Sequence, residues 1–376
     1  MDNFLEGELS ISIKDNKKTI ILHINDKEKV SIENITFKPL NFEETEILLG
    51  EDNQERLIPL KIASCKISNQ QMLPPELNLK DEITKIEIES SWSLKIIALT
   101  IGGWLPAGIT PSDSQYLLDK NVFNILNTRY NNGELRESIG NDFFDLISTD
   151  KIIINPSLFM LEGNNQSYDR TKKDLAEKYE EAVSIVKKTL PNSIIPHSCK
   201  ALTDSTFGML SQLYKNNIDK ISFIQEIIIH LYKETAIKKR KTIIKTLKEI
   251  AISNHIDRKS ILFIAALSAA LSNPKSNPAK KIFKPKPPKE YTQKHAYNAL
   301  SDFRAIDYLL WATAINPERK SYLCTNDKNL VRFWCAIEPT NLIFIENRTS
   351  FNLKIKERLF SNLNDEEFQW IVDSTR

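Results

Sequence analysis

Two aspartates stand where a predicted strand gives way to a predicted helix. The apolar strand predicted at 115–118 leads directly into Asp119, and the strand predicted at 321–325 leads to Asp327. An aspartate at such a junction is a favoured helix N-cap, and either residue alone fits that role. In open parallel sheets, however, ligand sites gather at the carboxyl ends of the strands. Two acids delivered to that edge could therefore share one divalent cation.

A third aspartate falls among apolar side chains on a predicted helix, 296–315. At about 100° per residue, Asp307 lies ~40° from Phe303, inside the apolar stripe. A buried carboxylate requires a cation, a hydrogen-bond network or a raised pKa. We therefore expect Asp307 to be a metal ligand, with an internal salt bridge, for example to Arg304, as the alternative. Asp302 lies on the margin of the stripe, as an auxiliary ligand or as a surface or capping acid.

Glu162 ends a short apolar segment, 156–162, which starts with a proline and precedes a glycine. Proline is favoured at the first position of a helix, so a short helix is expected here. A glutamate at a helix terminus can equally be solvated. Glu162 is a candidate because of the acids that accompany it.

The order of these acids resembles the PIN-like nuclease family, over about residues 115–165 and 296–346. In that family a strand runs into an aspartate and a following helix carries a glutamate. A later helix carries an aspartate before small and apolar residues, and a strand then ends in Thr-x-Asp. The matching residues here are, in chain order, Asp119, Glu162, Asp307 and Asp327.

The resemblance implies hydrolysis of phosphodiester bonds in RNA or DNA, with Mg²⁺ or Mn²⁺ as the cofactor. Clustered carboxylates suit this task because hard divalent cations prefer oxygen ligands. The resemblance further implies direct or water-mediated ligation by Asp119, Asp307 and Asp327, with Glu162 as a ligand or a water-positioning residue. The gap between Glu162 and Asp307 is much longer than in compact members of the family.

The elements that must position these acids alternate between strand and helix on both sides of a long helical stretch. Before them, alternating apolar strands are separated by polar turns, as in a sandwich or partial barrel. We predict an α/β PIN-like core with a parallel sheet and a helical insertion, preceded by a mainly β N-terminal domain of unknown role. The predicted bounds are 1–108 for the β domain, 109–168 and 295–376 for the core, 169–272 for the insertion and 273–294 for a basic Lys/Pro-rich linker or loop.

Basic residues gather in the later part of the chain. Residues 1–100 hold 18 acidic and 12 basic side chains, which leaves 31 acidic and 39 basic for residues 101–376. The stretch 273–294, with seven lysines and five prolines, is expected to be extended, exposed and mobile. Two clusters are candidates for binding the nucleic-acid backbone, although each could equally be a solvated face. They consist of Lys238, Lys239, Arg240 and Lys241, and of Lys280, Lys281, Lys284 and Lys286.

Other classes of protein are disfavoured. The four cysteines are scattered without a CxxC pair and no HExxH occurs, so a zinc site is not expected. The longest strongly apolar run, 261–271, is too short to cross a bilayer, and the N-terminus lacks a signal-peptide pattern, so we expect no membrane association and a cytoplasmic location. No Walker-type GxxxxGK[ST] is present, and Asp119 is not part of a DxD pair as a phosphatase nucleophile would be.

Two hypotheses of function remain. The first is a Mg²⁺- or Mn²⁺-dependent nuclease, by analogy a toxin-like or anti-phage defence effector, whose N-terminal β domain contacts a protein partner or regulator. The alternative is a catalytically silent PIN-like scaffold or nucleic-acid-binding protein.

Overall fold

The computed structural model describes residues 8–374, except 15–16, 24–28, 51–56, 69–86, 91, 112, 137–140, 163–170, 273–275, 347 and 361–362. Side chains are described from residue 35 onward, except within 65–90 and 209–215.

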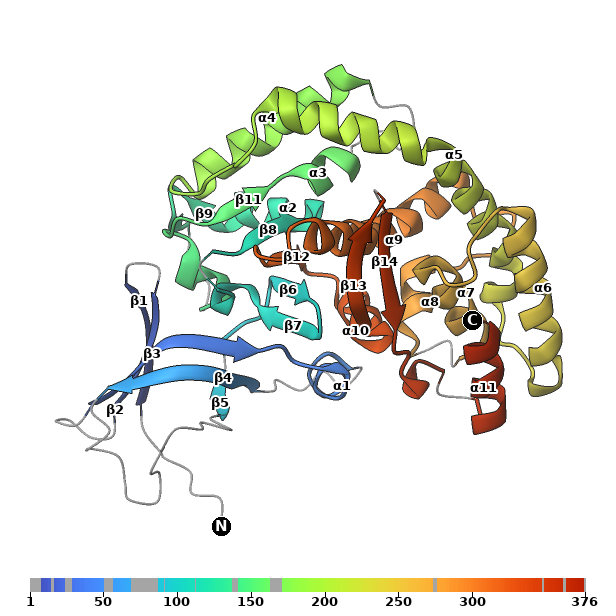
Figure 1. The fold of residues 1–376 in the computed structure, drawn as a ribbon, viewed down its shortest axis with the longest axis horizontal. Helices are drawn as coiled ribbons and strands as arrows, with labels where there is room; N and C mark the ends of the chain where they lie inside the picture. The colour runs from blue at the N-terminus through green and yellow to red at the C-terminus, as the bar shows by residue number, and fades with distance from the viewer. Residues whose placement is uncertain are drawn as a thin grey trace, which may run out of the picture.

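The centre of the molecule is a mixed five-stranded sheet with the strand order β11-β8-β12-β6-β7 (Figure 1). β8 is parallel to both β11 and β12, whereas β6 is antiparallel to β12 and to β7. The chain is therefore mixed α/β with parallel strand pairs at its centre. The strands are β6 (Ile97–Thr100), β7 (Gly103–Pro106), β8 (Gln115–Leu118), β11 (Ile153–Asn155) and β12 (Ser321–Thr325).

A helix follows each of the three parallel strands after a short connection. α2 (Lys120–Arg129) follows β8, α3 (Ser157–Glu162) follows β11, and α10 (Lys328–Ile337) follows β12. α9 (Gln293–Ile315) precedes β12 and is buried on most of its sides.

A second five-stranded sheet is formed by the N-terminal part of the chain. It is an antiparallel meander in sequence order, made of β1 (Glu8–Lys14), β2 (Lys17–His23), β3 (Lys29–Lys38), β4 (Ile58–Ser68) and β5 (Glu87–Ser90). α1 (Phe42–Leu49) lies between β3 and β4 in the sequence and against α10 in space (Figure 1).

The predicted boundary at residue 108 is wrong. β6 and β7 lie before it but belong to the central sheet, because Leu99 pairs with Leu323 of β12 and the apolar strand is buried there. The β7 end of this hairpin also pairs with the chain after β3, through two backbone hydrogen bonds between Leu40 and Trp104. Gly103 adopts φ 141°, and a Cβ atom there would collide with the Leu40 carbonyl, so this approach requires glycine.

Helices fill the stretch between α3 and α9. α4 (Lys172–Thr189) and the long α5 (Cys199–Tyr232) arch over α3 and α9, and α6 (Arg240–Ser253) and α7 (Ile261–Leu271) follow beside them (Figure 1). α7 is buried along its whole length, which explains its uninterrupted apolar sequence.

The prediction that 273–294 is extended throughout is also wrong, because α8 (Pro278–Phe283) lies inside it. The Asn277 side chain accepts a hydrogen bond from the N–H of Lys280 and caps the helix, and Pro278 occupies a first-turn position. Ile282 and Phe283 are buried in the core beside α7, α9 and α10. Burial of these apolar side chains therefore favours a packed helix over the extended conformation expected from the lysines around them.

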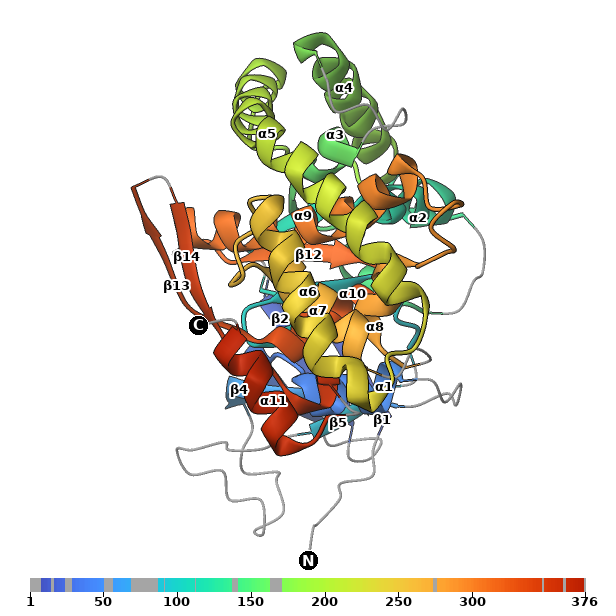
Figure 2. The same ribbon diagram turned by 90° about the vertical axis from the view of Figure 1, so that its right-hand side faces the viewer.

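The C-terminal part adds a hairpin and a last helix. The hairpin of β13 (Pro339–Ile345) and β14 (Arg348–Leu353) projects from the body, and α11 (Asp365–Ser374) packs near α6 (Figure 2). Shorter elements are the paired β9 (Tyr130–Asn131) and β10 (Glu134–Leu135), and 3-10 turns at Ala107–Ile109, Phe143–Ile147, Ile237–Lys239 and Glu357–Phe360. Among the described helices, none is both long and apolar enough to cross a membrane.

Candidate carboxylate site

Asp119 and Asp327 lie at the carboxyl ends of two adjacent parallel strands. The backbone N–H of Asp119 donates to the Cys324 carbonyl of β12, at 3.1 Å. Each aspartate also caps the helix that follows it. Asp119 Oδ1 accepts from the N–H of Val122 at 2.7 Å, and Asp327 Oδ1 accepts from the N–H of Leu330 at 3.2 Å. The capping role and the position at the sheet edge therefore coexist.

Thr325 connects the two aspartates. Its buried hydroxyl accepts a hydrogen bond from the Asp327 N–H at 3.0 Å, and its side chain is also hydrogen-bonded to the Asp119 carboxylate. This threonine is the first residue of the Thr-x-Asp turn, so the turn fixes both acids.

Burial makes the Asp119 carboxylate harder to ionise. The side chain is almost fully buried, and this desolvation raises the pKa of Asp119 to about 7. The hydrogen bonds from Thr325 and Val122 lower it, whereas the charges of Glu162 and Asp327 raise it further. The charges of the other carboxylates thus disfavour the ionised form of Asp119.

The same carboxylates also affect the ionisation of Asp302. Burial raises the pKa of Asp302 well above its usual value, and the charges of Asp327, Glu162 and Asp119 raise it further. The positive charge of Lys284 opposes this rise. The charges of Asp119, Glu162 and Asp327 therefore all act on Asp302.

The remaining two acids lie on helices, Glu162 on α3 and Asp302 on α9. Glu162 is the last residue of α3, and the hydroxyl of Tyr297 on α9 is hydrogen-bonded to the carbonyl of the preceding residue, Leu161, at 3.4 Å. Asp302 is five residues further along α9 than Tyr297.

Asp307 does not share this environment. Its side chain is 46% exposed and contacts Lys220 of α5 at 3.4 Å between Oδ2 and Nζ. The expectation that Asp307 is buried in an apolar stripe is therefore wrong, and its ion pair with Lys220 is half-exposed, unlike the internal salt bridge given as the alternative. The apolar stripe wrongly predicted a buried Asp307 side chain because α9 is buried on most of its sides. Apolar neighbours therefore do not mark a single inward direction on this helix.

Asn155 is a further polar residue at the same edge that the sequence patterns did not single out. It ends β11, the third parallel strand, and is 5% exposed. Its side-chain oxygen accepts from the N–H of Ser157 at 2.9 Å, and its side chain is also hydrogen-bonded to the Tyr308 hydroxyl. The signal for Asn155 in the sequence is its place between the apolar residues 152–154 and Pro156.

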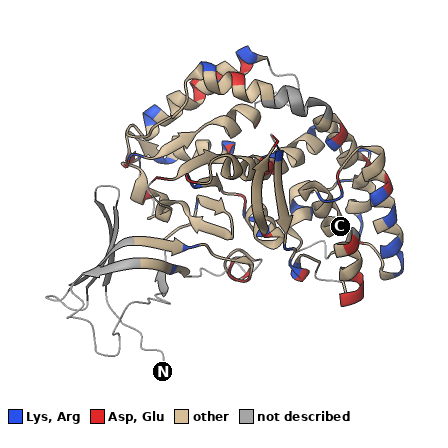
Figure 3. Ribbon diagram, in the orientation of Figure 1, with Lys and Arg blue, Asp and Glu red and all other residues tan. Residues whose placement is uncertain are grey.

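The basic candidates divide into exposed and buried residues. Arg240 is buried in an ion pair with Glu367 of α11, at 2.6 Å, and Lys280 is buried with α8, so neither is free to bind a backbone phosphate. The exposed candidates are Lys238, Lys239, Lys241, Lys281, Lys284 and Lys286. Figure 3 shows the cations of α6, whose one acid is Glu249, beside the acids of α11.

No group of three or more His, Cys, Asp or Glu side chains is arranged as a ready ligand set for a metal ion within the described residues. Comparison of the chain with models of protein families, with curated proteins and with solved structures found no match. The site must therefore be judged on its own chemistry.

Proposed function

We propose that the chain is a Mg²⁺- or Mn²⁺-dependent phosphodiester hydrolase that acts on nucleic acid, with a PIN-like core. What supports this is that Asp119 and Asp327 follow adjacent parallel strands and that the charges of Asp119, Asp327 and Glu162 all act on Asp302. Asp302 takes the place that the sequence patterns gave to Asp307.

The donor set fits a hard divalent cation. All four side chains offer carboxylate oxygens, the ligand type that Mg²⁺ and Mn²⁺ prefer. Mutual repulsion among unscreened carboxylates is unfavourable, and a bound cation would offset it. When bound, such a cation would activate a water molecule and stabilise negative charge on the scissile phosphate.

The chain's own residues supply positioning. The N-cap hydrogen bonds hold one oxygen of Asp119 and one of Asp327, and Thr325 ties the two residues together. Burial of Asp119 limits access of bulk water to its carboxylate. The Lys284 ammonium, whose charge acts on Asp302, offers a positive charge to phosphate oxygens that approach the acids.

The decisive experiment compares aspartates on the two sides of α9. Asp119→Asn and Asp302→Asn should each lower cleavage of labelled RNA or DNA about 100-fold or more, because each removes a charge that acts on the reaction. Asp307→Asn is the matched control and should stay within a few-fold of the wild-type rate. Reactions with Mg²⁺, Mn²⁺ or EDTA on single-stranded and duplex substrates give the metal requirement and the preferred nucleic acid.

A second readout does not depend on activity. Mn²⁺ should raise the melting temperature of the wild type, since a ligand that binds only the folded state stabilises it, and this rise should shrink in Asp119→Asn. Loss of cleavage in Asp307→Asn with full activity in Asp302→Asn would refute the assignment of Asp302. No cleavage under any condition, with no effect of Mn²⁺ on melting, would refute the proposed function.

A further inference from the structure

The strand β13 has a free edge. Within the described residues it pairs only with β14, and the hairpin of these two strands projects from the body (Figure 2). In an antiparallel pair, the backbone N–H and C=O groups of every second residue point away from the partner strand. A row of such groups on β13 is therefore available to another strand.

A groove of about 450 Å³ lies along this edge. Four consecutive residues of β13, 342–345, line the groove, and consecutive side chains of a strand point to opposite faces. A groove that touches all four residues therefore follows the edge of the strand. The other lining residues are Ile101, Thr313, Ala314 and Pro317, so the groove is largely apolar.

Exposed apolar side chains accompany the groove. Ile343 and Ile345 are 49% and 57% exposed, and they share one face of β13 because they are two residues apart. Exposed isoleucines on a free edge strand favour association with another strand. This surface thus combines apolar side chains, a groove and free backbone groups, and a surface of this kind can be complementary to a copy of itself.

Charges distinguish the edge of β13 from that of β14. Arg348 of β14 and Lys354, which follows β14, are both exposed. Antiparallel pairing of β14 with a second β14 would bring Arg348 of one copy toward Lys354 of the other, which is unfavourable. In contrast, β13 (Pro339–Ile345) contains no charged residue. Antiparallel pairing of two β13 strands places Glu346, which follows β13, beside the uncharged start of the other strand.

We propose that this surface binds a second copy of the chain, with the two β13 strands paired antiparallel about a two-fold axis. The two hairpins then form one four-stranded sheet, and each β13 lies along the groove of the other copy. The exposed isoleucines become cross-strand neighbours, and apolar pairs of this kind stabilise a sheet. A two-stranded hairpin is only marginally stable by itself, so the wider sheet also stabilises the hairpin. This assembly is independent of the proposed hydrolase activity.

Sedimentation velocity of the full-length chain over a wide range of concentrations measures this association. The wild type should form a dimer with twice the 43.2 kDa mass of one chain. Ile343→Lys should raise the Kd of the dimer about tenfold or more, because symmetric pairing brings the two introduced ammonium groups together. Ile252→Lys, at an exposed isoleucine of α6, is the matched control and should leave the Kd unchanged.

A mixture of two variants excludes loss of folding as the cause. Ile343→Glu alone should also dissociate, whereas Ile343→Lys and Ile343→Glu mixed in equal amounts should form a dimer, because opposite charges then meet across the two-fold axis. A wild type that is monomeric at every concentration, a dimer that survives Ile343→Lys, an equal loss in Ile252→Lys or a mixture that stays monomeric would each overturn the proposal. Binding of an unrelated apolar peptide in the groove by a monomeric wild type would instead assign the groove to another protein.

Discussion

At the residue scale, Asp145 shows how a partly buried charge is stabilised away from the carboxylate site. It accepts two hydrogen bonds from the guanidinium of Arg129, at 2.8 and 2.6 Å, and one from the Tyr130 hydroxyl at 2.6 Å. Although burial raises its pKa, the bonds from Arg129 and Tyr130 prevail and lower the pKa of Asp145 below its usual 3.8. Ionised Asp145 therefore stabilises the folded state.

The sign of the pH dependence follows from this shift. Because the folded pKa lies below the unfolded one, the stabilisation is present above pH 3.8 and is lost as the pH falls through the folded value. Asp145→Asn should lower the free energy of unfolding at pH 7 by roughly 3–5 kcal/mol, since Arg129 stays buried without its charged partner. Urea unfolding at pH 7 and at pH 3 measures both effects. A loss that is equally large at the lowest pH would contradict this account.

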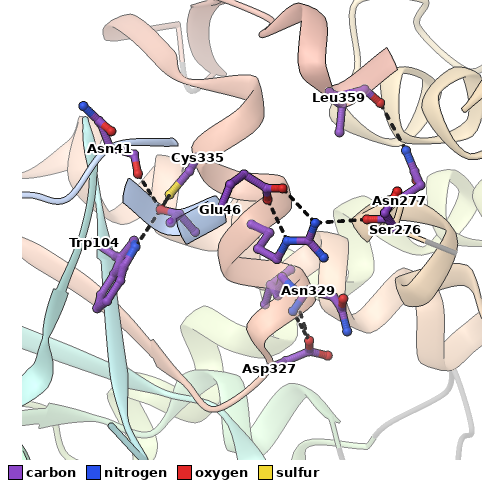
Figure 4. Close-up of polar contacts among 12 residues, drawn as sticks. Asn41, Glu46, Trp104, Ser276, Asn277, Asp327, Asn329, Cys335 and Leu359 are labelled. Carbon is purple, nitrogen blue, oxygen red and sulfur yellow. Dashed lines mark hydrogen bonds and ion pairs between the residues drawn. The ribbon is translucent and has the colours of Figure 1, made fainter. Parts of the chain in front are cut away.

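At the element scale, α1 packs against α10 and holds it in position through polar contacts. Arg332 of α10 forms two hydrogen bonds with the carboxylate of Glu46 on α1, at 2.6 and 2.9 Å, and a third with the Ser276 carbonyl at 3.0 Å (Figure 4). Nearby, Thr45 of α1 accepts from the Trp104 indole N–H at 2.8 Å. α10 begins at its cap Asp327, so these contacts also fix the position of a candidate ligand.

Glu46→Gln should therefore destabilise the fold by about 3–5 kcal/mol, because it leaves the buried Arg332 without a counter-charge. Glu43→Gln on the same helix is the control: Glu43 is 61% exposed, and its 3.9 Å contact with Lys356 should contribute less than about 1 kcal/mol. Chemical denaturation of both variants measures the difference. Equal stability of the two variants would mean that the Arg332 contact does not clamp α10.

At the scale of the whole molecule, the N-terminal sheet and the α/β body share one hydrophobic core. The core runs without interruption from Ile35 and Leu40 to Ile371. The chain after β3 also pairs with β7 through the backbone of Leu40. We therefore expect the two parts to unfold together.

Leu40→Ala should reveal this cooperation. Leu40 is 1% exposed, and removing its side chain should cost about 2–5 kcal/mol. The tryptophans lie between Trp92 and Trp370, so their fluorescence reports mainly on the body. In Leu40→Ala, the urea midpoint measured by tryptophan fluorescence should fall together with the midpoint measured by far-ultraviolet circular dichroism. Ile47→Ala, on the exposed side of α1, should shift neither midpoint. Separate transitions for the two signals would indicate two independent folding units.

Local sequence determined the strand ends and their caps. An apolar run followed by aspartate predicted β8 with Asp119 and β12 with Asp327, because strand burial and N-capping both depend on a few neighbouring residues. The short helix that ends in Glu162 was predictable for the same reason, from Pro156 and four apolar residues.

Only the tertiary structure decided which aspartate of α9 interacts with the acids at the strand ends. Asp302 and Asp307 point about 140° apart on the helix, so only one of them can do so. Periodicity could not choose between them, because α9 is buried on most sides and its apolar residues mark several neighbours at once. The same holds for β6, β7 and α8, whose places depend on partners distant in the sequence: β12 for the hairpin and α10 for the helix. Partner choice of this kind is absent from local patterns, since it depends on which surfaces the folded chain brings together.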